Sequence, residues 1–239
     1  WMESVPKIFR RAVGNSIKAI KKDSSSEKIA ALLESDTFDF EYTYPLLRQT
    51  LFPGTISKLL NHTISHKHSV KNSAKEISGK ITKKDFLITK ISIAEINTYL
   101  QNVLLRDTDQ MSMAHALEVR VPFLDYELVE YILNLPDEYK EPVTSKKLLI
   151  DSMGDLLSRE IISQPKKGFT FPWKYWMQNE LKSFCESKIN SLSKRNMFEE
   201  SEVKKLWMDF LKQDKRVTWS RVWHLIVLEN WIQQNGIET

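Results

Sequence analysis

The chain has 239 residues, a formal net charge of +4 and 41% hydrophobic residues, which is the composition of a globular protein. Its apolar runs are far shorter than the about 18 residues that a membrane-spanning helix needs, so we expect no membrane partner. The charge is too small to indicate nucleic-acid binding unless the basic residues share one face. The single cysteine, Cys185, cannot form an internal disulfide, so we expect a reducing, cytoplasmic location.

Six glycines and eight prolines are few for this length, and they lie far apart. Long segments without these residues favour helices over a β-sandwich or barrel, which needs frequent turns. No alternation of strands with helices is visible, so we expect no parallel sheet within the chain. The sequence therefore predicts an all-α, mainly helical fold. Because the chain begins with Trp1 rather than methionine, we also expect it to be a piece of a longer protein or a processed one.

Residues 1–87 predict a helical N-terminal segment that contains a polar loop. Apolar and basic residues recur at helical spacing over 5–22. A capping box formed by Ser24 and Glu27 predicts a second helix, and residues 42–51 predict a short third one.

Residues 62–84 are rich in serine, lysine, asparagine and histidine, and their weak periodicity predicts a loop or a weak helix. The three histidines of this stretch have no cysteine or clear fourth ligand nearby, so we predict surface histidines and no metal site. They are His62, His66 and His68.

Residues 88–239 predict a second helical region. Ser92 and Glu95 form a capping box, and Asp107 with Gln110 forms a weaker one that opens a helix over 111–118. Asp125 is expected to cap the next helix. Further helices are predicted over 126–135, 146–153 (capped by Thr144), 173–189, 199–212 and 218–234. The last of these carries a tryptophan stripe that suits either core packing or, as the alternative, base stacking.

The first candidate site is the predicted helix over 111–118 with the turns on either side. Asp109 and Ser112 share a helix face, while Glu118 and Arg120 stand at the C-terminal exit. A carboxylate there faces the unfavourable end of the helix dipole, so Glu118 needs a cation, and Arg120 is the obvious one. Such a pair is either structural or part of a site, and composition alone leaves both open.

The second candidate site is the loop over 164–172, in which Pro, Gly and Pro exclude a helix. Lys166 and Lys167 lie in this loop, just before a cluster of aromatic residues. A lysine in this setting can neutralise phosphate charge, although an exposed basic turn explains it equally. The glycines are too scattered to form a phosphate-binding loop in this chain.

Together the two segments resemble the signature of the asparagine synthetase family over roughly residues 88–235. The first carries most of the resemblance, and the second continues it with a lysine, a glycine and a phenylalanine before Pro172 and Trp176. The matching residues of the first are Leu104-Leu105-Arg106, Asp109, Met111-Ser112-Met113-Ala114, Leu117-Glu118-Val119-Arg120 and Pro122-Phe123-Leu124-Asp125.

This resemblance implies an ATP-dependent, glutamine-hydrolysing ligase. An N-terminal glutaminase releases ammonia, and a synthetase domain uses ATP and Mg²⁺ to convert aspartate to an acyl-adenylate, which ammonia attacks. The nucleotide is held by a Ser-Gly-Gly-x-Asp-Ser loop in a parallel sheet. Neither this loop nor the glutaminase is in the chain, so the resemblance implies the C-terminal helical part of an adenine nucleotide α-hydrolase-like synthetase domain. We expect this part alone to be inactive and to bind no ATP or Mg²⁺.

The resemblance also implies roles for single residues. Lys166 matches the lysine that stabilises the adenylate and pyrophosphate charges, and Lys167 stands beside it. Glu118 and Arg120 match positions on the substrate side, with Glu118 assigned to catalysis. Asp109 and Ser112 match positions near the nucleotide cleft. The implied partners are the upstream glutaminase and nucleotide-loop domains of the same protein, with aspartate, glutamine or ammonia, and ATP as substrates.

Three alternatives remain at this stage. Gln110, Gln164 and the Gln101-Asn102 pair depart from the residues common in the family, so the acceptor could be a carboxylate other than that of aspartate. A non-catalytic helical scaffold explains the missing phosphate loop, and a nucleic-acid-binding domain explains the basic charge with the tryptophans. A helical piece separated from its sheet would also expose an apolar face and could form a homodimer.

Overall fold

The computed structural model describes residues 4–61, 69–81, 86–140, 146–165, 168 and 171–237. Helices dominate these residues, and the β pairing found among them is limited to an isolated bridge between Leu60 and Phe198. The predicted all-α fold is confirmed. Among the described helices, none has the length and apolarity that crossing a bilayer requires.

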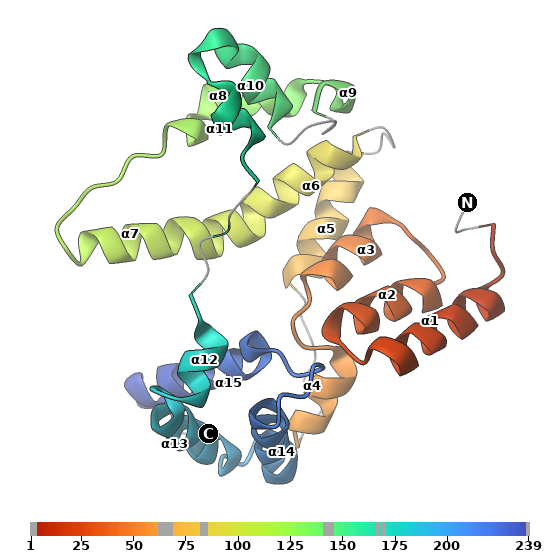
Figure 1. Cartoon of the computed structure of the whole chain (residues 1–239), viewed down its shortest axis with the longest axis vertical. Coiled ribbons are helices and arrows are strands. Elements are labelled where there is room, and N and C mark those ends of the chain that lie inside the picture. Colours follow the sequence, from red (N-terminus) through yellow and green to blue (C-terminus); the bar gives the residue numbers. More distant parts are fainter. Residues whose placement is uncertain are drawn as a thin grey trace. The chain divides into compact units, whose positions relative to one another are not determined.

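The chain forms two compact units that interleave along the sequence (Figure 1). Unit 1 contains residues 1–38, 46–66 and 169–239, and unit 2 contains residues 39–45 and 67–168. Helix α3 (Phe40–Arg48) belongs partly to each unit. The predicted division of the chain at residue 87 is not tested by this grouping and stays a prediction.

Unit 1 contains α1 (Lys7–Lys21), α2 (Ser24–Glu34), α4 (Pro53–Leu59), α12 (Trp173–Gln178), α13 (Lys182–Ser193), α14 (Glu200–Leu211) and α15 (Trp219–Gln234). Unit 2 contains α5 (Ser69–Lys80), α6 (Leu87–Glu95), the π-helix η1 (Ile96–Leu105), α7 (Arg106–Met113), the 3₁₀ turn η2 (Pro122–Leu124), α8 (Tyr126–Asn134), α9 (Asp137–Lys140), α10 (Lys147–Met153), the 3₁₀ turn η3 (Gly154–Leu156) and α11 (Arg159–Ser163).

The larger core lies in unit 1 and is formed mainly by α13, α14 and α15. Their buried side chains repeat every three or four residues, which is the spacing of one helix face. Cys185, Phe210 and Ile226 are each almost fully buried there. The tryptophan stripe of α15 is only partly core, because Trp223 packs against this cluster while Trp231 is 54% exposed.

Helices α1 and α2 lie side by side at the N-terminal end of unit 1 (Figure 1). Their backbones approach closely because Gly14 of α1 faces Ala30 of α2, and a Cβ atom added at Gly14 would lie 3.2 Å from the Ala30 Cα. The helix predicted over 5–22 is confirmed as α1, but its apolar side chains are not buried within unit 1. Ile8 and Ile20 are each 80% exposed.

Unit 2 has a small core in which α3, α5 and α6 meet through Tyr44, Ala74 and Ala94. The polar stretch at 62–84 therefore contains an ordered helix, α5, and a helix was one of the two alternatives for it. Its ends at 62–68 and 82–85, with all three histidines, lie outside the described residues.

The predicted helix caps at Ser24 and Ser92 differ from the structure. The capping box of Ser92 and Glu95 is wrong, because α6 begins at Leu87 and both residues lie inside it. Helix α2 is capped by Asp23 rather than Ser24, because the extended Asp23 backbone lets its carboxylate accept from the Ser26 N–H at 2.7 Å. Asp125 caps α8 as predicted, accepting from the N–H groups of Glu127 and Leu128. The expected cap Thr144 lies outside the described residues.

The helix predicted over 173–189 is two helices, α12 and α13. Helix α12 ends at Gln178, where the Asn179 backbone leaves the helical region at φ −125° and ψ −92°. Asn179 also donates its side-chain amide to the Tyr175 carbonyl at 2.8 Å, which satisfies one of the carbonyls at the helix end.

Candidate functional site

Asp109 and Ser112 lie on α7, at the end of a long helical run that continues from α6 through η1 (Figure 1). Ser112 donates its hydroxyl to the backbone carbonyl of Asp109 at 3.1 Å, so the two residues share one helix face as predicted. The Asp109 side chain is exposed and Ser112 is half-buried. The capping box expected at Asp107 is wrong, because the helix does not begin there.

Helix α7 ends at Met113, five residues before the predicted end. Ala116 adopts the left-handed conformation with φ 54°, and the Leu117 N–H donates to the Ser112 carbonyl at 3.0 Å. This pattern closes the helix with a turn, and an αL residue at this position is how many helices terminate. The prediction that Glu118 stands at the end of a helix is therefore wrong.

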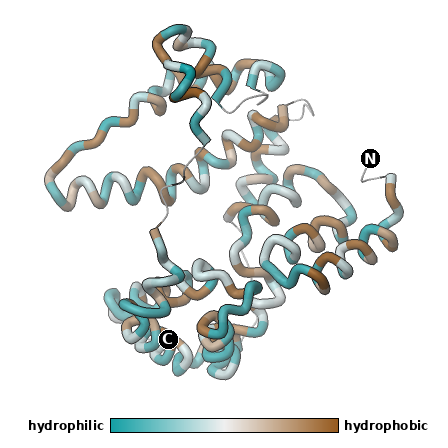
Figure 2. The backbone as a smooth tube through the Cα atoms, in the orientation of Figure 1, coloured by the Kyte–Doolittle hydropathy of each residue, from teal (hydrophilic) through white to brown (hydrophobic). Residues whose placement is uncertain are grey.

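Glu118 and Arg120 instead lie in an irregular segment between α7 and η2. Their side chains form the expected ion pair, with Arg120 Nη2 2.6 Å from Glu118 Oε1. The pair is open to solvent, since the two side chains are 71% and 85% exposed. The apolar residues that alternate with it are exposed as well, and the tube in Figure 2 has hydrophobic colour over parts of this segment. They are Leu117, Val119, Val121 and Phe123.

No hydrogen bond or ion pair among the described residues joins the Asp109–Ser112 pair to the Glu118–Arg120 pair. All four residues belong to unit 2. Lys166 and Lys167 lie outside the described residues. The aromatic residues from Phe171 onward are described, and they form a cluster around Trp173, whose ring centroid is 4.7 Å from that of Trp223 and 5.9 Å from that of Trp219.

A large apolar groove lies within unit 2, next to the irregular segment. It encloses about 960 Å³, and it is lined by α6, η1, η2, α8, α9 and α10. Phe123 and Leu124, the end of the signature segment, form part of its wall. Lys146 and Lys147 supply positive charge at the lining. This volume falls within the usual range for small-ligand sites, about 300–1,000 Å³.

A buried polar network supports one end of the groove. Asp137 accepts from the backbone N–H of Ile88 at 2.6 Å and of Thr89 at 3.1 Å, so it holds the N-terminus of α6. Lys140 donates to the Thr89 hydroxyl at 2.6 Å and to the Leu133 carbonyl at 3.0 Å. Burial lowers the pKa of Lys140, although the nearby Asp137 carboxylate opposes this shift.

Sequence reasoning missed this network and the π-helix η1. The Leu135-Pro136 pair does mark the end of α8, but nothing in the sequence relates Asp137 to residues 48 or 49 positions earlier. Within η1, Asn102 donates to the Asn97 and Thr98 carbonyls at 3.2 and 2.9 Å. π-Helical turns often occur at functional sites, and this one leads directly into α7.

Comparison with known proteins places these features in a family. The family model for asparagine synthase matches residues 16–233, so the family's pattern extends well before residue 88, where the sequence resemblance begins. No solved structure matches the chain significantly.

Among curated proteins, the chain is similar to asparagine synthetase [glutamine-hydrolyzing] 1 of Bacillus subtilis, with 28% identity over 145 residues. That match covers 60% of this chain but only 23% of the relative. Asparagine synthetase of Gallus gallus is 43% identical over 76 residues, which are 30% of this chain and 13% of the relative. Amidase chry2 of Gibberella zeae is 29% identical over 89 residues, which are 34% of this chain and 13% of that protein. The family match covers most of the sequence, and the chain belongs to the asparagine synthase family.

Proposed function

We propose that this chain is the C-terminal helical part of an ATP-dependent, glutamine-hydrolysing asparagine synthetase or a close amidotransferase relative. The family match over residues 16–233 is the observation that carries this proposal. In the proposed reaction, the carboxylate of aspartate attacks the α-phosphorus of ATP, and pyrophosphate leaves. Ammonia from glutamine then attacks the acyl carbon, and AMP leaves as the amide forms.

The proposed roles follow from the charge of each side chain. Lys166 neutralises negative charge on the adenylate and the departing pyrophosphate, and Lys167 adds charge beside it. Glu118 and Arg120 face the substrate side. The exposed Arg120 guanidinium, which already pairs with Glu118, can donate charge-assisted hydrogen bonds to the carboxylate of the substrate. Asp109 and Ser112 line the nucleotide side. The exposed apolar residues between α7 and η2 support docking of another part of the same protein on this segment.

Mg²⁺ is implied by the family, but the described residues do not suit it. They contain no group of three carboxylate, histidine or cysteine side chains that could hold a metal ion. Mg²⁺ usually binds through carboxylates and substrate phosphates. We therefore assign its ligands to the upstream nucleotide-loop domain, and we propose that the isolated chain does not turn over ATP. A cytoplasmic location also belongs to this proposal.

The decisive experiment uses the full-length protein with its upstream sequence. Pyrophosphate release and asparagine formation would be measured with ATP, aspartate and ammonium, and glutaminase activity would be measured separately. Lys166→Ala should abolish pyrophosphate release and leave glutaminase activity unchanged. Lys174→Ala, an exposed lysine of α12, serves as the matched control and should keep both activities.

The same assay separates the alternatives. Pyrophosphate release with a different carboxylate, but not with aspartate, would keep the amidotransferase chemistry and change the acceptor. No ATP turnover with any carboxylate would instead favour a non-catalytic helical scaffold. Unchanged synthesis in the Lys166→Ala variant would remove this lysine from the mechanism.

A further inference from the structure

A second hollow, which we call the basic hollow, lies entirely within unit 1. It encloses about 550 Å³ between the C-terminal end of α1, the start of α2, helix α4 and the turn before α15. Its lining combines four basic residues with an apolar side. The basic residues are Lys18, Lys22, Lys58 and Arg216, and the apolar side includes Ala31, Phe52 and Gly54.

The negative charges in the basic hollow are already engaged. Asp23 accepts from the Ser26 N–H at 2.7 Å and from the Ser26 hydroxyl at 2.6 Å. Glu27 forms an ion pair with Arg221 at 2.6 Å. These two carboxylates are the acids of the lining. Lys18 and Arg216 pair with acids outside it, so Lys22 and Lys58 supply the positive charge that no ion pair among the described residues offsets.

The side chains of two of the four basic residues form no hydrogen bond or ion pair with another described residue, although the charge of Lys22 contributes to the lowered pKa of Asp214. Lys18 lies 3.4 Å from Glu34, and Arg216 forms a close fork with Asp214. Within the described part of the chain, neither Lys22 nor Lys58 has a hydrogen-bond or ion-pair partner for its ammonium group. A lysine at the C-terminal end of a helix interacts favourably with the helix dipole, and this effect alone would account for the position of Lys22 or of Lys58. That effect does not require two helix ends and Arg216 to converge on one hollow.

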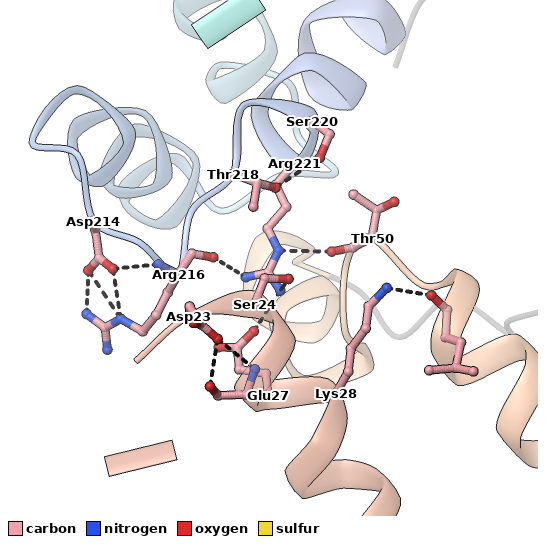
Figure 3. Close-up of polar contacts among 12 residues, drawn as sticks. Asp23, Ser24, Glu27, Lys28, Thr50, Asp214, Arg216, Thr218, Ser220 and Arg221 are labelled. Atoms are coloured by element: carbon pink, nitrogen blue, oxygen red, sulfur yellow. Dashed lines mark hydrogen bonds and ion pairs between the residues drawn. The ribbon is translucent and has the colours of Figure 1, made fainter. Parts of the chain in front are cut away.

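The wall of the basic hollow is held in place by Arg221, which is only 4% exposed (Figure 3). Its guanidinium donates to the Thr50 carbonyl at 2.9 Å, to the Arg216 carbonyl, and to Ser24 and Glu27. One side chain thereby joins α2, the segment before α4 and the turn before α15. A hollow fixed in this way needs little rearrangement to bind a ligand.

From this arrangement we infer that the basic hollow binds a small organic phosphate, with the phosphoryl group between Lys22 and Lys58 and the apolar portion against Phe52. A phosphate dianion can accept charge-assisted hydrogen bonds from two ammonium groups at once. The volume exceeds that of a bare phosphate and suits a ligand with an attached ring or chain. This inference does not depend on the proposed function.

The test is titration calorimetry of the 239-residue chain with phenyl phosphate, with potassium chloride at equal ionic strength as the reference. We expect saturable binding that weakens about tenfold or more in the double variant Lys22→Ala/Lys58→Ala. The matched control is Lys71→Ala/Lys75→Ala, which removes two exposed lysines of α5 and should leave affinity unchanged. Circular dichroism would verify that both variants fold.

Three results would overturn the inference. The first is no binding beyond the chloride reference, and the second is equal affinity in the Lys22/Lys58 variant and the wild type. The third is an equal loss of affinity in the control variant, which would indicate general attraction to a basic protein. Inorganic phosphate that binds as tightly as phenyl phosphate would contradict the role of Phe52.

Discussion

Arg195 and Glu229 form a two-pronged ion pair that ties the turn between α13 and α14 to the last helix, α15. Arg195 Nε lies 2.6 Å from Glu229 Oε2, and Arg195 Nη2 lies 3.1 Å from Glu229 Oε1. The Glu229 side chain is 1% exposed, and it also accepts from Gln233 at 2.6 Å. The hydrogen bond with Glu229 raises the pKa of Arg195. The carboxylate therefore depends on Arg195 for its compensating charge.

Replacing Arg195 should be among the most damaging single changes in unit 1. Arg195→Ala leaves the Glu229 carboxylate buried without a cation, and breaking a buried pair in this way costs about 3–5 kcal/mol. The measurement is the free energy of unfolding in urea. Lys204→Ala, which breaks an exposed pair with Glu200, is the control and should cost less than about 0.5 kcal/mol. Equal losses for the two variants would contradict the role assigned to Arg195.

The contact between α1 and α2 should not tolerate a larger residue at position 14. In Gly14→Val the side chain would meet the Ala30 backbone, because even a Cβ atom would lie 3.2 Å from Ala30 Cα. Overpacking of this kind typically costs about 1–3 kcal/mol.

Gly79 of α5 is the matched control, because a Cβ atom added there meets nothing within 4 Å. Gly79→Ala should stabilise the helix by about 0.5–1 kcal/mol, since alanine loses less backbone entropy than glycine. Thermal unfolding of both variants checks the contrast. A stable Gly14→Val variant would show that the two helices can separate without cost.

Asp214 should make the stability of unit 1 fall at acid pH. The side chain and backbone N–H groups of Arg216 lower the pKa of Asp214 from 3.8 to about 2. A carboxyl group with a lowered folded-state pKa stabilises the fold fully above the unfolded value, and this stabilisation is lost as pH falls from about 4 to about 2. Because solvent screens the pair, we expect about 1 kcal/mol or less.

The check is urea unfolding of wild type and Asp214→Asn at several pH values. The wild type should be more stable near neutral pH, and the two proteins should converge near pH 2. A difference that stays constant from pH 6 to pH 2 would contradict this account, because it would not depend on the charge of Asp214.

Cys185 should be unreactive in the folded protein. Its thiol is fully buried in the core of α13, α14 and α15, and burial raises its pKa to about 11. Since the thiolate is the nucleophile, very little of the reactive form exists at pH 8. Iodoacetamide should label Cys185 only after unfolding, as followed by mass spectrometry. Rapid labelling under native conditions would contradict this packing.

Helices α14 and α15 of unit 1 could be predicted from the sequence because their own residues supply the signal. Buried positions in α14 and α15 repeat at helical spacing, and that spacing predicted both helices to within one or two residues. The end of α7 could not be predicted, since it depends on Ala116 adopting a left-handed conformation that alanine rarely takes. Periodicity contains no information about such a residue.

Contacts across long sequence separations were equally hidden. Asp137 caps α6 although it lies 49 positions further along the chain, and no local sequence pattern predicts such a partner. The Glu118–Arg120 pair was expected because both residues lie within one short segment. Its exposure, however, depends on which elements cover that segment. The roles of Asp109, Ser112 and Lys166 come from family resemblance and stay predictions.

The exposure of the Glu118–Arg120 pair allows its proposed function to be separated from any structural role. Both side chains are more than two thirds exposed, and exposed ion pairs typically contribute about 0–1 kcal/mol. Glu118→Gln and Arg120→Ala in the full-length protein should therefore change the free energy of unfolding by less than about 1 kcal/mol.

If these residues face the substrate, the same two variants should lower pyrophosphate release at least about tenfold, because a lost charge-assisted contact in the transition state costs more than 1.4 kcal/mol. Glu76→Gln, which breaks an equally exposed pair with Lys80 on α5, is the control and should keep full activity. Stable Glu118 and Arg120 variants with wild-type rates would instead show an ordinary surface ion pair. The charged contacts to the substrate would then have to come from residues outside this segment, because the described residues between α7 and η2 form no other ion pair.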